Sequence, residues 1–327
     1  MLVGVDGGQS STQTVVCDAS GTALASVTTA PVGSSQTRES ILATLRESFT
    51  DAMKEAGTET APAYVHLGLS GVGWCAELRS AYPGAALTFG GDAEVAHRSA
   101  FPLERTGVVV IAGTGSIGYG RTATGRIATK GGKGYLVDDA GGAFDIGRAA
   151  LRAVYRADDG RGPDTALASL LLQSTGCTDL SAYLHSVLYR DPSPVPRIAD
   201  LARLVGVAAD QGDPVATSIL EQAGEELAEL ATSVLRDLDH ESSPLAVTPI
   251  GGVFRTGGPL RRAFSNRLST AQPMPIVRDS PNPPVLGAIL LAASECREAA
   301  DDAEILSRFI ESRDIIPTKS DNHRSKG

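Results

Sequence analysis

The chain has no long hydrophobic run. None of its apolar stretches approaches the ~18 residues that a membrane-spanning helix needs, and the first residues enter a predicted strand without the basic segment of a secretory signal. A basic surface is also missing, because 29 Lys and Arg residues stand against 38 Asp and Glu, for a net charge of −9. Since nucleic acid requires a concentrated basic face, we expect a cytoplasmic protein with neither nucleic acid nor a membrane as its partner.

Cysteine is scarce and scattered. Cys17, Cys75, Cys177 and Cys296 form no C-x-x-C pair. Their spacing therefore indicates neither a zinc site nor a redox motif, and we expect all four to be buried thiols.

The rest of the composition is typical of a soluble globular protein, with 42% hydrophobic and 20% charged residues. The 327 residues exceed one typical core and are enough for two domains. Strands alternate with helices along the chain, and residues 165–238 read almost wholly as helices. This alternation predicts an α/β protein with a mostly parallel sheet.

The stretch from Leu2 to Cys17 joins two apolar strands through a Gly-rich turn. Asp6 supplies a carboxylate at the end of the first strand, and the permissive Gly7-Gly8 backbone follows it. The turn then offers N–H and hydroxyl donors that suit an anion, and this first Gly-rich turn comprises Gly8, Gln9, Ser10, Ser11 and Thr12.

The pattern returns at Val108 to Gly120, where a second Gly-rich turn comprises Gly113, Thr114, Gly115 and Ser116. Taken singly, each stretch reads equally well as an ordinary hairpin whose glycines serve only the turn. Each is followed by a further hairpin signal, however, and this wider similarity predicts an internal duplication.

Two further turns carry polar or flexible residues at strand ends. The predicted strand 86–89 leads through Gly90-Gly91 to Asp92, which suits the N-cap of the next helix. It also stands at the carboxyl end of a strand, where α/β sheets bind ligands, and would accept a proton there as a base; the two roles are compatible. A third Gly-rich turn, Gly251-Gly252, follows the strand predicted at 245–249.

An acidic segment follows the second Gly-rich turn. Asp138, Asp139 and Asp145 lie within eight residues around a Gly-Gly helix start. Each alone suits the positive end of a helix dipole, whereas three together indicate a site for a polyhydroxyl or cationic ligand.

These motifs together resemble the N-acetylglucosamine kinase and BadF/BadG/BcrA/BcrD ATPase family of the actin, hexokinase and sugar-kinase superfamily. The motifs that carry the resemblance, in order, are DGGQSST at 6–12, GD at 91–92, GTGS at 113–116, GGKG at 131–134, DDAGGAFDIGR at 138–148, GDP at 212–214 and GG at 251–252.

The resemblance implies an α/β fold of two actin-like, ribonuclease H-like domains with a nucleotide cleft between them. It implies a small domain at 1–111, a larger helix-rich domain at 112–297, a helix at about 298–316 that packs back on the first domain, and a flexible tail at 317–327. A homodimer through the larger domain is also implied.

The same resemblance assigns roles to single residues. ATP would be held by the three Gly-rich turns and Mg²⁺ by Asp6, and Asp92 would be the catalytic base. The sugar-contacting aspartate of the family falls on Asp139, and the substrate-binding set that we expect comprises Gln36, Ser70, Gly132, Asp138, Asp139 and Asp145.

The chain departs from the family where the sugar should bind. Kinases for N-acetylglucosamine tend to read GTGSN, GGWG and GDEGS, whereas this chain has Ile117, Lys133 and an added carboxylate at Asp138. A free amine favours carboxylates as acceptors, so we expect D-glucosamine as the acceptor, with N-acetylglucosamine or glucose open if Asp138 only caps the helix or pairs with Lys133.

Two other classes of protein stay open. An ATPase activator of the same superfamily would bridge an iron–sulfur cluster through paired cysteines, which the scattered cysteines do not support. A sugar-sensing repressor or an actin-like filament protein is the other alternative, although no DNA-binding module precedes the first strand.

Overall fold

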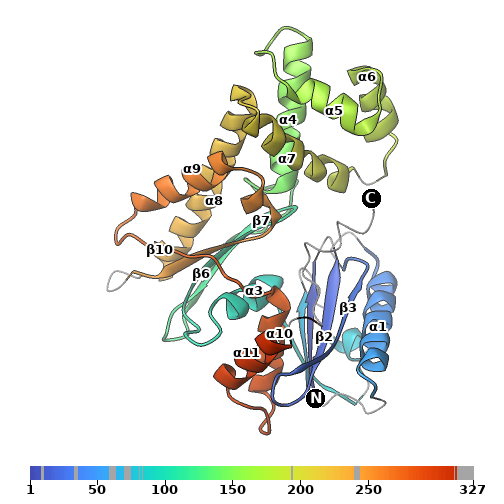
Figure 1. The fold of residues 1–327 in the computed structure, drawn as a ribbon, viewed down its shortest axis with the longest axis vertical. Coiled ribbons are helices and arrows are strands. Elements are labelled where there is room, and N and C mark those ends of the chain that lie inside the picture. Colours follow the sequence, from blue (N-terminus) through green and yellow to red (C-terminus); the bar gives the residue numbers. More distant parts are fainter. Residues whose placement is uncertain are drawn as a thin grey trace. The chain divides into compact units, whose positions relative to one another are not determined.

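The computed structural model describes residues 1–8, 11–32, 36–58, 64–69, 75–80, 82, 84–192, 194–238, 244–312 and 314. Gln9, Ser10 and Ser70, all expected in the site, lie outside these residues. The chain divides into two compact units, one of residues 1–106 with 280–327 and one of residues 107–279 (Figure 1).

The first unit is built on a five-stranded sheet in the order β3-β2-β1-β4-β5. Its strands are β1 (Leu2–Gly7), β2 (Thr12–Cys17), β3 (Ala23–Thr29), β4 (Tyr64–Leu69) and β5 (Ala86–Gly90). β1, β2 and β3 pair antiparallel, whereas β1, β4 and β5 run parallel. The sheet is therefore mixed.

Helices cover both faces of this sheet (Figure 1). They are α1 (Arg38–Glu55), α2 (Cys75–Arg79), α3 (Asp92–Ala100), α10 (Pro284–Ser294) and α11 (Asp302–Glu311). One helix, α1, has apolar residues at helical spacing, including Ile41 and Leu45, and buries this stripe against one face. On the other face, α10 and α11 pack on Leu2 and Val15.

The helix α10 belongs to the first unit, although the sequence-based boundaries of 1–111 and 112–297 place it with the second. Its backbone approaches β1 so closely that a Cβ on Gly4 would lie 2.9 Å from the Ile289 nitrogen. A Cβ on Gly287 would likewise collide with the Val95 carbonyl oxygen of α3. Small residues therefore allow α10 to pack directly against the sheet and α3.

The second unit repeats the sheet of the first. Its strands are β6 (Gly107–Ala112), β7 (Ser116–Arg121), β8 (Ile127–Gly131), β9 (Ala246–Ile250) and β10 (Ile276–Val277), in the order β10-β9-β6-β7-β8. In both units three antiparallel strands are followed by two parallel ones. This common order confirms the predicted duplication.

The expectation of a mostly parallel sheet is wrong for both units. The short turns after β1, β2, β6 and β7 can join only antiparallel neighbours, because a parallel pair needs a crossover of a dozen or more residues. The alternation of strands with helices begins only after each hairpin set.

The helices of the second unit are α4 (Ala143–Asp158), α5 (Leu167–Thr175), α6 (Leu180–Tyr183), η1 (Leu184–Leu188), α7 (Val195–Asp210), α8 (Pro214–Leu238), η2 (Gly252–Arg255) and α9 (Gly258–Ser269). The longest, α8, starts at Pro214, where a proline is well tolerated, and packs on β6, β7 and β8. Its buried residues join the main core of this unit.

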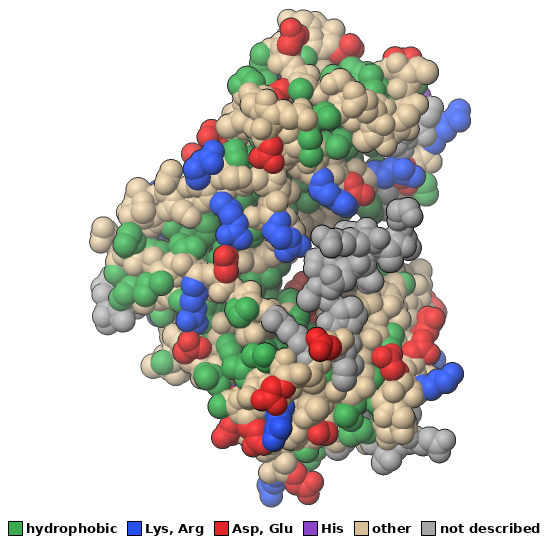
Figure 2. Space-filling model, in the orientation of Figure 1, with side chains coloured by type: hydrophobic (Ala, Val, Ile, Leu, Met, Phe, Trp, Pro, Cys, Tyr) green, Lys and Arg blue, Asp and Glu red, His purple; other side chains and the backbone are tan. Residues whose placement is uncertain are grey.

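The surface and the cysteines complete the description. Lys and Arg side chains are interspersed with Asp and Glu on the face shown in Figure 2, and none of the helices in the described ranges could span a membrane. Cys17 is buried as predicted, and burial raises the pKa of its thiol. Cys177 and Cys296 are only half-buried because they lie at the margins of their cores; the side chain of Cys75 lies outside the described part.

Candidate functional site

In the first unit, three parallel strands end at one edge of the sheet. β1, β4 and β5 are in register, so that Asp6 lies beside Gly68 and Gly68 beside Gly90. Asp6 is only 5% exposed. The parallel arrangement thus brings the Asp6 carboxylate to the same edge as the end of β5, where Asp92 follows.

The first Gly-rich turn closes through its own backbone. The Gly8 N–H donates to the Ser11 carbonyl oxygen at 3.1 Å, and the Gly8 carbonyl accepts from the Val32 N–H at 3.1 Å. Ser11 is half-buried, and the buried Thr12 hydroxyl has no hydrogen-bond partner among the described residues. Gln36 is half-buried just before Thr37, the N-cap of α1.

Asp92 is the first residue of α3 and not its N-cap. The N-cap is Gly91, which has the extended backbone typical of that position. The Asp92 carboxylate is half-buried and accepts the Ala93 N–H at 2.9 Å. The N-cap interpretation is therefore wrong, whereas the position at the end of a parallel strand, beside a helix N-terminus, is as predicted.

The second Gly-rich turn is fixed by the start of α4. Its carbonyls accept the first helical N–H groups, from Ala143 to Gly113 at 2.8 Å and from Phe144 to Thr114 at 3.0 Å. In the part of the chain that the structure describes, the N–H groups of Thr114 and Gly115 have no acceptor. Two adjacent free N–H groups in a rigid turn suit a phosphate oxygen.

The third Gly-rich turn lies against the second. β6 and β9 run parallel with Ile111 beside Ile250. Gly251 has a φ of +113°, and a Cβ there would lie 2.8 Å from the Ala112 carbonyl carbon. Only glycine fits this close approach, and it brings Gly251-Gly252 next to the start of the second turn.

The three carboxylates of the acidic segment have different surroundings. Asp145 is held by Arg148 at 2.7 Å and by the Gly141 N–H at 3.1 Å. Asp138 is half-buried, and its carboxylate has no hydrogen bond or ion pair with any described residue, Lys133 included.

Asp139 is 7% exposed and accepts the Gly134 N–H at 3.2 Å. Burial raises the pKa of this carboxyl, and the negative charge of Asp138 adds to the rise, although the backbone N–H groups of Gly134 and Ser116 oppose it. The structure therefore brings Asp139 to the second turn and leaves Asp138 as the residue of the acidic segment that has no partner among the described residues.

The predicted site residues fall in both units. Asp6, Gln36, Asp92 and the described part of the first turn lie in the first unit. The second and third turns, the acidic segment and Gly132 lie in the second. Gly132 has a φ of +67°, and its N–H donates to the Ser116 carbonyl, so it also lies beside the second turn.

Sequence reasoning missed the importance of Gly142. A Cβ at this position would lie 2.9 Å from the Thr114 carbonyl oxygen and from the Gly115 Cα. Gly142 therefore lets α4 reach the second turn, and the only signal for this was the Gly-Gly pair before a helix.

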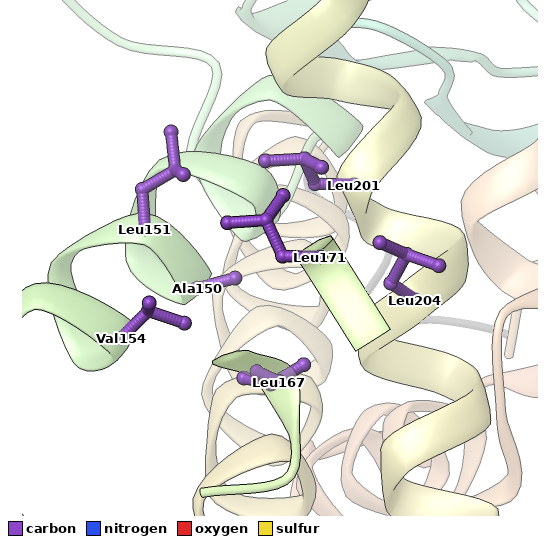
Figure 3. Close-up of a pocket in the computed structure, with 7 residues that line it drawn as sticks. All are labelled: Ala150, Leu151, Val154, Leu167, Leu171, Leu201 and Leu204. Atoms are coloured by element: carbon purple, nitrogen blue, oxygen red, sulfur yellow. The ribbon is translucent and has the colours of Figure 1, made fainter. Parts of the chain in front are cut away.

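A pocket elsewhere in the second unit has a different character. It opens between α4, α5 and α7, has an empty volume of about 210 Å³, and is lined by Ala150, Leu151, Val154, Leu167, Leu171, Leu201 and Leu204 (Figure 3). These side chains offer no polar atom to a sugar or a nucleotide, so this pocket is separate from the candidate site.

The chain matches a model of the BadF/BadG/BcrA/BcrD ATPase family over residues 3–292. The chain belongs to this family. The resemblance read from the motifs is thereby confirmed, and the two units are the two actin-like domains of the superfamily.

Three similar proteins illustrate the relationship. An N-acetylmuramic acid/N-acetylglucosamine kinase of Clostridium acetobutylicum is 30% identical over 305 residues, which cover 90% of this chain and 99% of that protein. The glucosamine kinase GspK of Vibrio cholerae is 26% identical over 241 residues, with 69% and 77% covered. The crystal structure of a proposed N-acetylglucosamine kinase from Chromobacterium violaceum has a TM-score of 0.71 at 29% identity, with 89% and 98% covered.

The cofactors of this ATPase family member are ATP and Mg²⁺. The residues fit both: the free N–H groups of Thr114 and Gly115 suit phosphate oxygens. Mg²⁺ is usually bound by one or two carboxylates together with substrate phosphates, and Asp6, on β1 and 5% exposed, offers one such carboxylate.

Proposed function

We propose that this chain, an ATP-dependent sugar kinase by its family and relatives, phosphorylates the 6-hydroxyl of D-glucosamine to give glucosamine 6-phosphate and ADP. The observation that carries the proposal is the carboxylate of Asp138, which no described residue neutralises. A relative that is a glucosamine kinase supports the same assignment.

The amine of glucosamine is the group that Asp138 would recognise. Near neutral pH this amine is substantially protonated, and a charged N–H donor prefers a carboxylate acceptor. Asp145 already forms an ion pair with Arg148, and Asp139 already accepts the Gly134 N–H. Asp138 is thus the member of the acidic segment that is available to a cationic ligand.

The chemistry follows from general features of phosphoryl transfer, in which a protein mainly positions groups and neutralises charge. Asp92 accepts the proton of the sugar 6-hydroxyl as its oxygen bonds to the γ-phosphorus and the bond to the ADP oxygen breaks. The N–H groups of Thr114 and Gly115 hold phosphate oxygens. Mg²⁺ neutralises the phosphate charge when bound, and Asp6 is the residue that would hold it.

A second acceptor, N-acetylglucosamine, has an observation in its favour. Leu136 and Val137 directly precede Asp138 and are 83% and 82% exposed. Exposed apolar side chains at this position could contact an acetyl methyl group, and the relative from Clostridium acetobutylicum is a kinase for N-acetylated sugars.

The deciding experiment compares kcat/KM for glucosamine, N-acetylglucosamine and glucose with ATP, in the wild type and in Asp138→Asn. A hydrogen bond to a charged group is worth ~1.5–3 kcal/mol, so glucosamine should exceed glucose by about tenfold or more. Asp138→Asn should reduce this preference and leave kcat/KM for glucose nearly unchanged. A wild type that prefers N-acetylglucosamine, or that treats glucosamine and glucose alike, would contradict the proposal.

Asp92→Asn tests the catalytic base. The amide cannot accept the hydroxyl proton, so turnover should fall by about 100-fold or more, while ADP and sugar still bind as measured by calorimetry. Near-normal turnover would remove Asp92 from the mechanism. Release of ADP from ATP only when sugar is present distinguishes a kinase from an ATPase activator or a sugar-sensing protein.

We also propose a homodimer formed through the helix-rich second unit. Light scattering at micromolar concentration tests it directly, and a monomer mass would reject it.

A further inference from the structure

An arginine lies over the third Gly-rich turn, Gly251-Gly252. This turn leads into the 3-10 helix η2, in which the side chains of residues i and i+3 stand one above the other. Gly252 and Arg255 are such a pair. Because Gly252 has no side chain, the Arg255 guanidinium lies close to its backbone, with Nη2 3.9 Å from the place of a Cβ at position 252. The geometry of η2 thus brings a positive charge to this turn.

The backbone that carries this arginine is anchored in the core. Val253 and Phe254, which separate Gly252 from Arg255, are each 2% exposed and belong to the main core of the unit. The Thr256 N–H, at the end of η2, donates to the Val253 carbonyl at 3.0 Å. Arg255 itself is exposed, so a rigid backbone presents its side chain to solvent.

The Arg255 guanidinium has no partner in the described part of the chain. No described residue forms a hydrogen bond or an ion pair with it, whereas Arg261 pairs with Asp279 at 3.3 Å and donates to the Phe254 carbonyl at 2.8 Å. An exposed arginine alone would indicate only a solvated surface. The position over a turn that is assigned to the nucleotide is what distinguishes Arg255.

The three Gly-rich turns contain no Lys or Arg. The second turn offers only the neutral N–H groups of Thr114 and Gly115, and the third turn rests against Ala112, just before it. Phosphate groups carry negative charge, and a guanidinium matches their geometry with two parallel N–H donors. A cation beside these neutral donors would complete a phosphate site within the second unit.

We propose that Arg255 binds a phosphate group of the donor nucleotide, together with the N–H groups of Thr114 and Gly115. This inference deepens the proposed function and rests on it for the assignment of the turns to ATP. The motifs do not predict this residue, because it lies outside the Gly-Gly pair and reaches the turn only through the geometry of η2. Arg255 takes no part in proton transfer, so its loss should raise the KM for ATP more than it lowers kcat.

The first test measures ADP binding by calorimetry in Arg255→Met and Arg255→Lys. Met keeps an unbranched apolar stem without the charge, and ADP affinity should fall about tenfold or more, as expected for the loss of a hydrogen bond to a charged group. Lys keeps the charge but not the paired donors, so its loss should be smaller. An unchanged ADP affinity in Arg255→Met would overturn the proposal.

A second measurement distinguishes a phosphate contact from stacking of the guanidinium on the adenine ring. Salt screens a charge pair, so ADP binding to the wild type should weaken as salt is raised, and Arg255→Met should reduce this dependence. Adenosine, which has no phosphate, should bind the wild type and Arg255→Met equally well. An unchanged salt dependence, with adenosine affinity lost in parallel, would show that the arginine contacts the base and would contradict the proposal.

Arg262→Met is the matched control. Arg262 is also exposed and without a partner among the described residues, and its Nη1 lies 2.9 Å from the place of a Cβ on Gly258. It belongs to α9 and not to the third turn, so its effect on ADP affinity should stay within about twofold, as for an exposed charge that forms no specific pair. An equal loss in Arg255→Met and Arg262→Met would mean that ADP responds only to the positive charge of this surface, and would reject the contact.

Because ADP binding needs no sugar, it separates this inference from the substrate assignment. If the wild type binds ADP but phosphorylates none of the three sugars, the proposed function fails, and Arg255→Met still tests the phosphate contact. If the wild type is an active sugar kinase and Arg255→Met keeps its KM for ATP, the inference alone fails.

Discussion

A buried histidine in the first unit makes the stability of the molecule depend on pH. His66 is 4% exposed on β4, and its Nδ1 lies 2.8 Å from the Thr88 hydroxyl oxygen. Burial lowers the pKa of this imidazole from 6.5 to about 4. The folded protein therefore holds His66 in its neutral form.

The sign of the effect follows from proton linkage. As the pH falls from about 6.5 towards 4, His66 becomes protonated in the unfolded chain but stays neutral in the folded chain. The free energy of unfolding therefore falls, by up to ~3 kcal/mol. Urea unfolding at pH 7 and pH 4.5 measures the loss. In His66→Gln the loss should be smaller by that amount, and an equal loss in variant and wild type would contradict the prediction.

The acidic segment shows how far single residues could be predicted. The sequence places Asp138, Asp139 and Asp145 together beside a helix start, but it predicts the same ligand-binding role for all three. Their roles separate only in the folded chain, where Asp139 lies against Gly115 of the second turn and accepts the Gly134 N–H, while Asp138 has no hydrogen bond or ion pair with any described residue. A buried carboxylate is defined by what packs on it, and that information is not local.

At the scale of elements, two arginines of different burial hold α11. Asp302, its first residue, lies 2.6 Å from Arg98 of α3 and 2.6 Å from Arg105. The Arg98 side chain is 6% exposed, whereas that of Arg105 is 50% exposed. Because both arginines pair with the same carboxylate, the two ion pairs can be compared to show how burial changes the contribution of an ion pair to stability.

Arg105→Ala removes the exposed pair and should reduce the free energy of unfolding by less than ~1 kcal/mol. Asp302→Ala leaves the buried guanidinium of Arg98 without this carboxylate and should cost ~3 kcal/mol or more. Urea unfolding of the full chain gives both values. If both variants lost an equal and small amount of unfolding free energy, the buried Arg98–Asp302 ion pair would contribute nothing to stability.

Most elements were predictable because their signals are local. The hairpins around both Gly-rich turns, the stripe of α1 and the Pro at the start of α8 all follow from neighbouring residues. The place of α10 was not predictable. Gly4 and Gly287 permit another segment to pack closely against their backbone, but the neighbouring sequence does not indicate which segment that is.

At the scale of the whole molecule, the second unit is one continuous segment and the first is not. Residues 107–279 form the second unit, with its own sheet and core. The first unit needs residues from both ends of the chain, because Leu2 and Val15 are covered by α10 and α11.

This difference predicts how fragments behave. The segment 107–279 should fold by itself, whereas 1–106 alone should not, because loss of α10 and α11 uncovers one apolar face of its sheet. Joining residues 280–314 ahead of Met1 through a Gly/Ser linker restores that cover and should restore a cooperative melt. Circular dichroism melts of the three fragments check this, and a sharp transition for 1–106 alone would show that α10 and α11 are not needed to complete the first core.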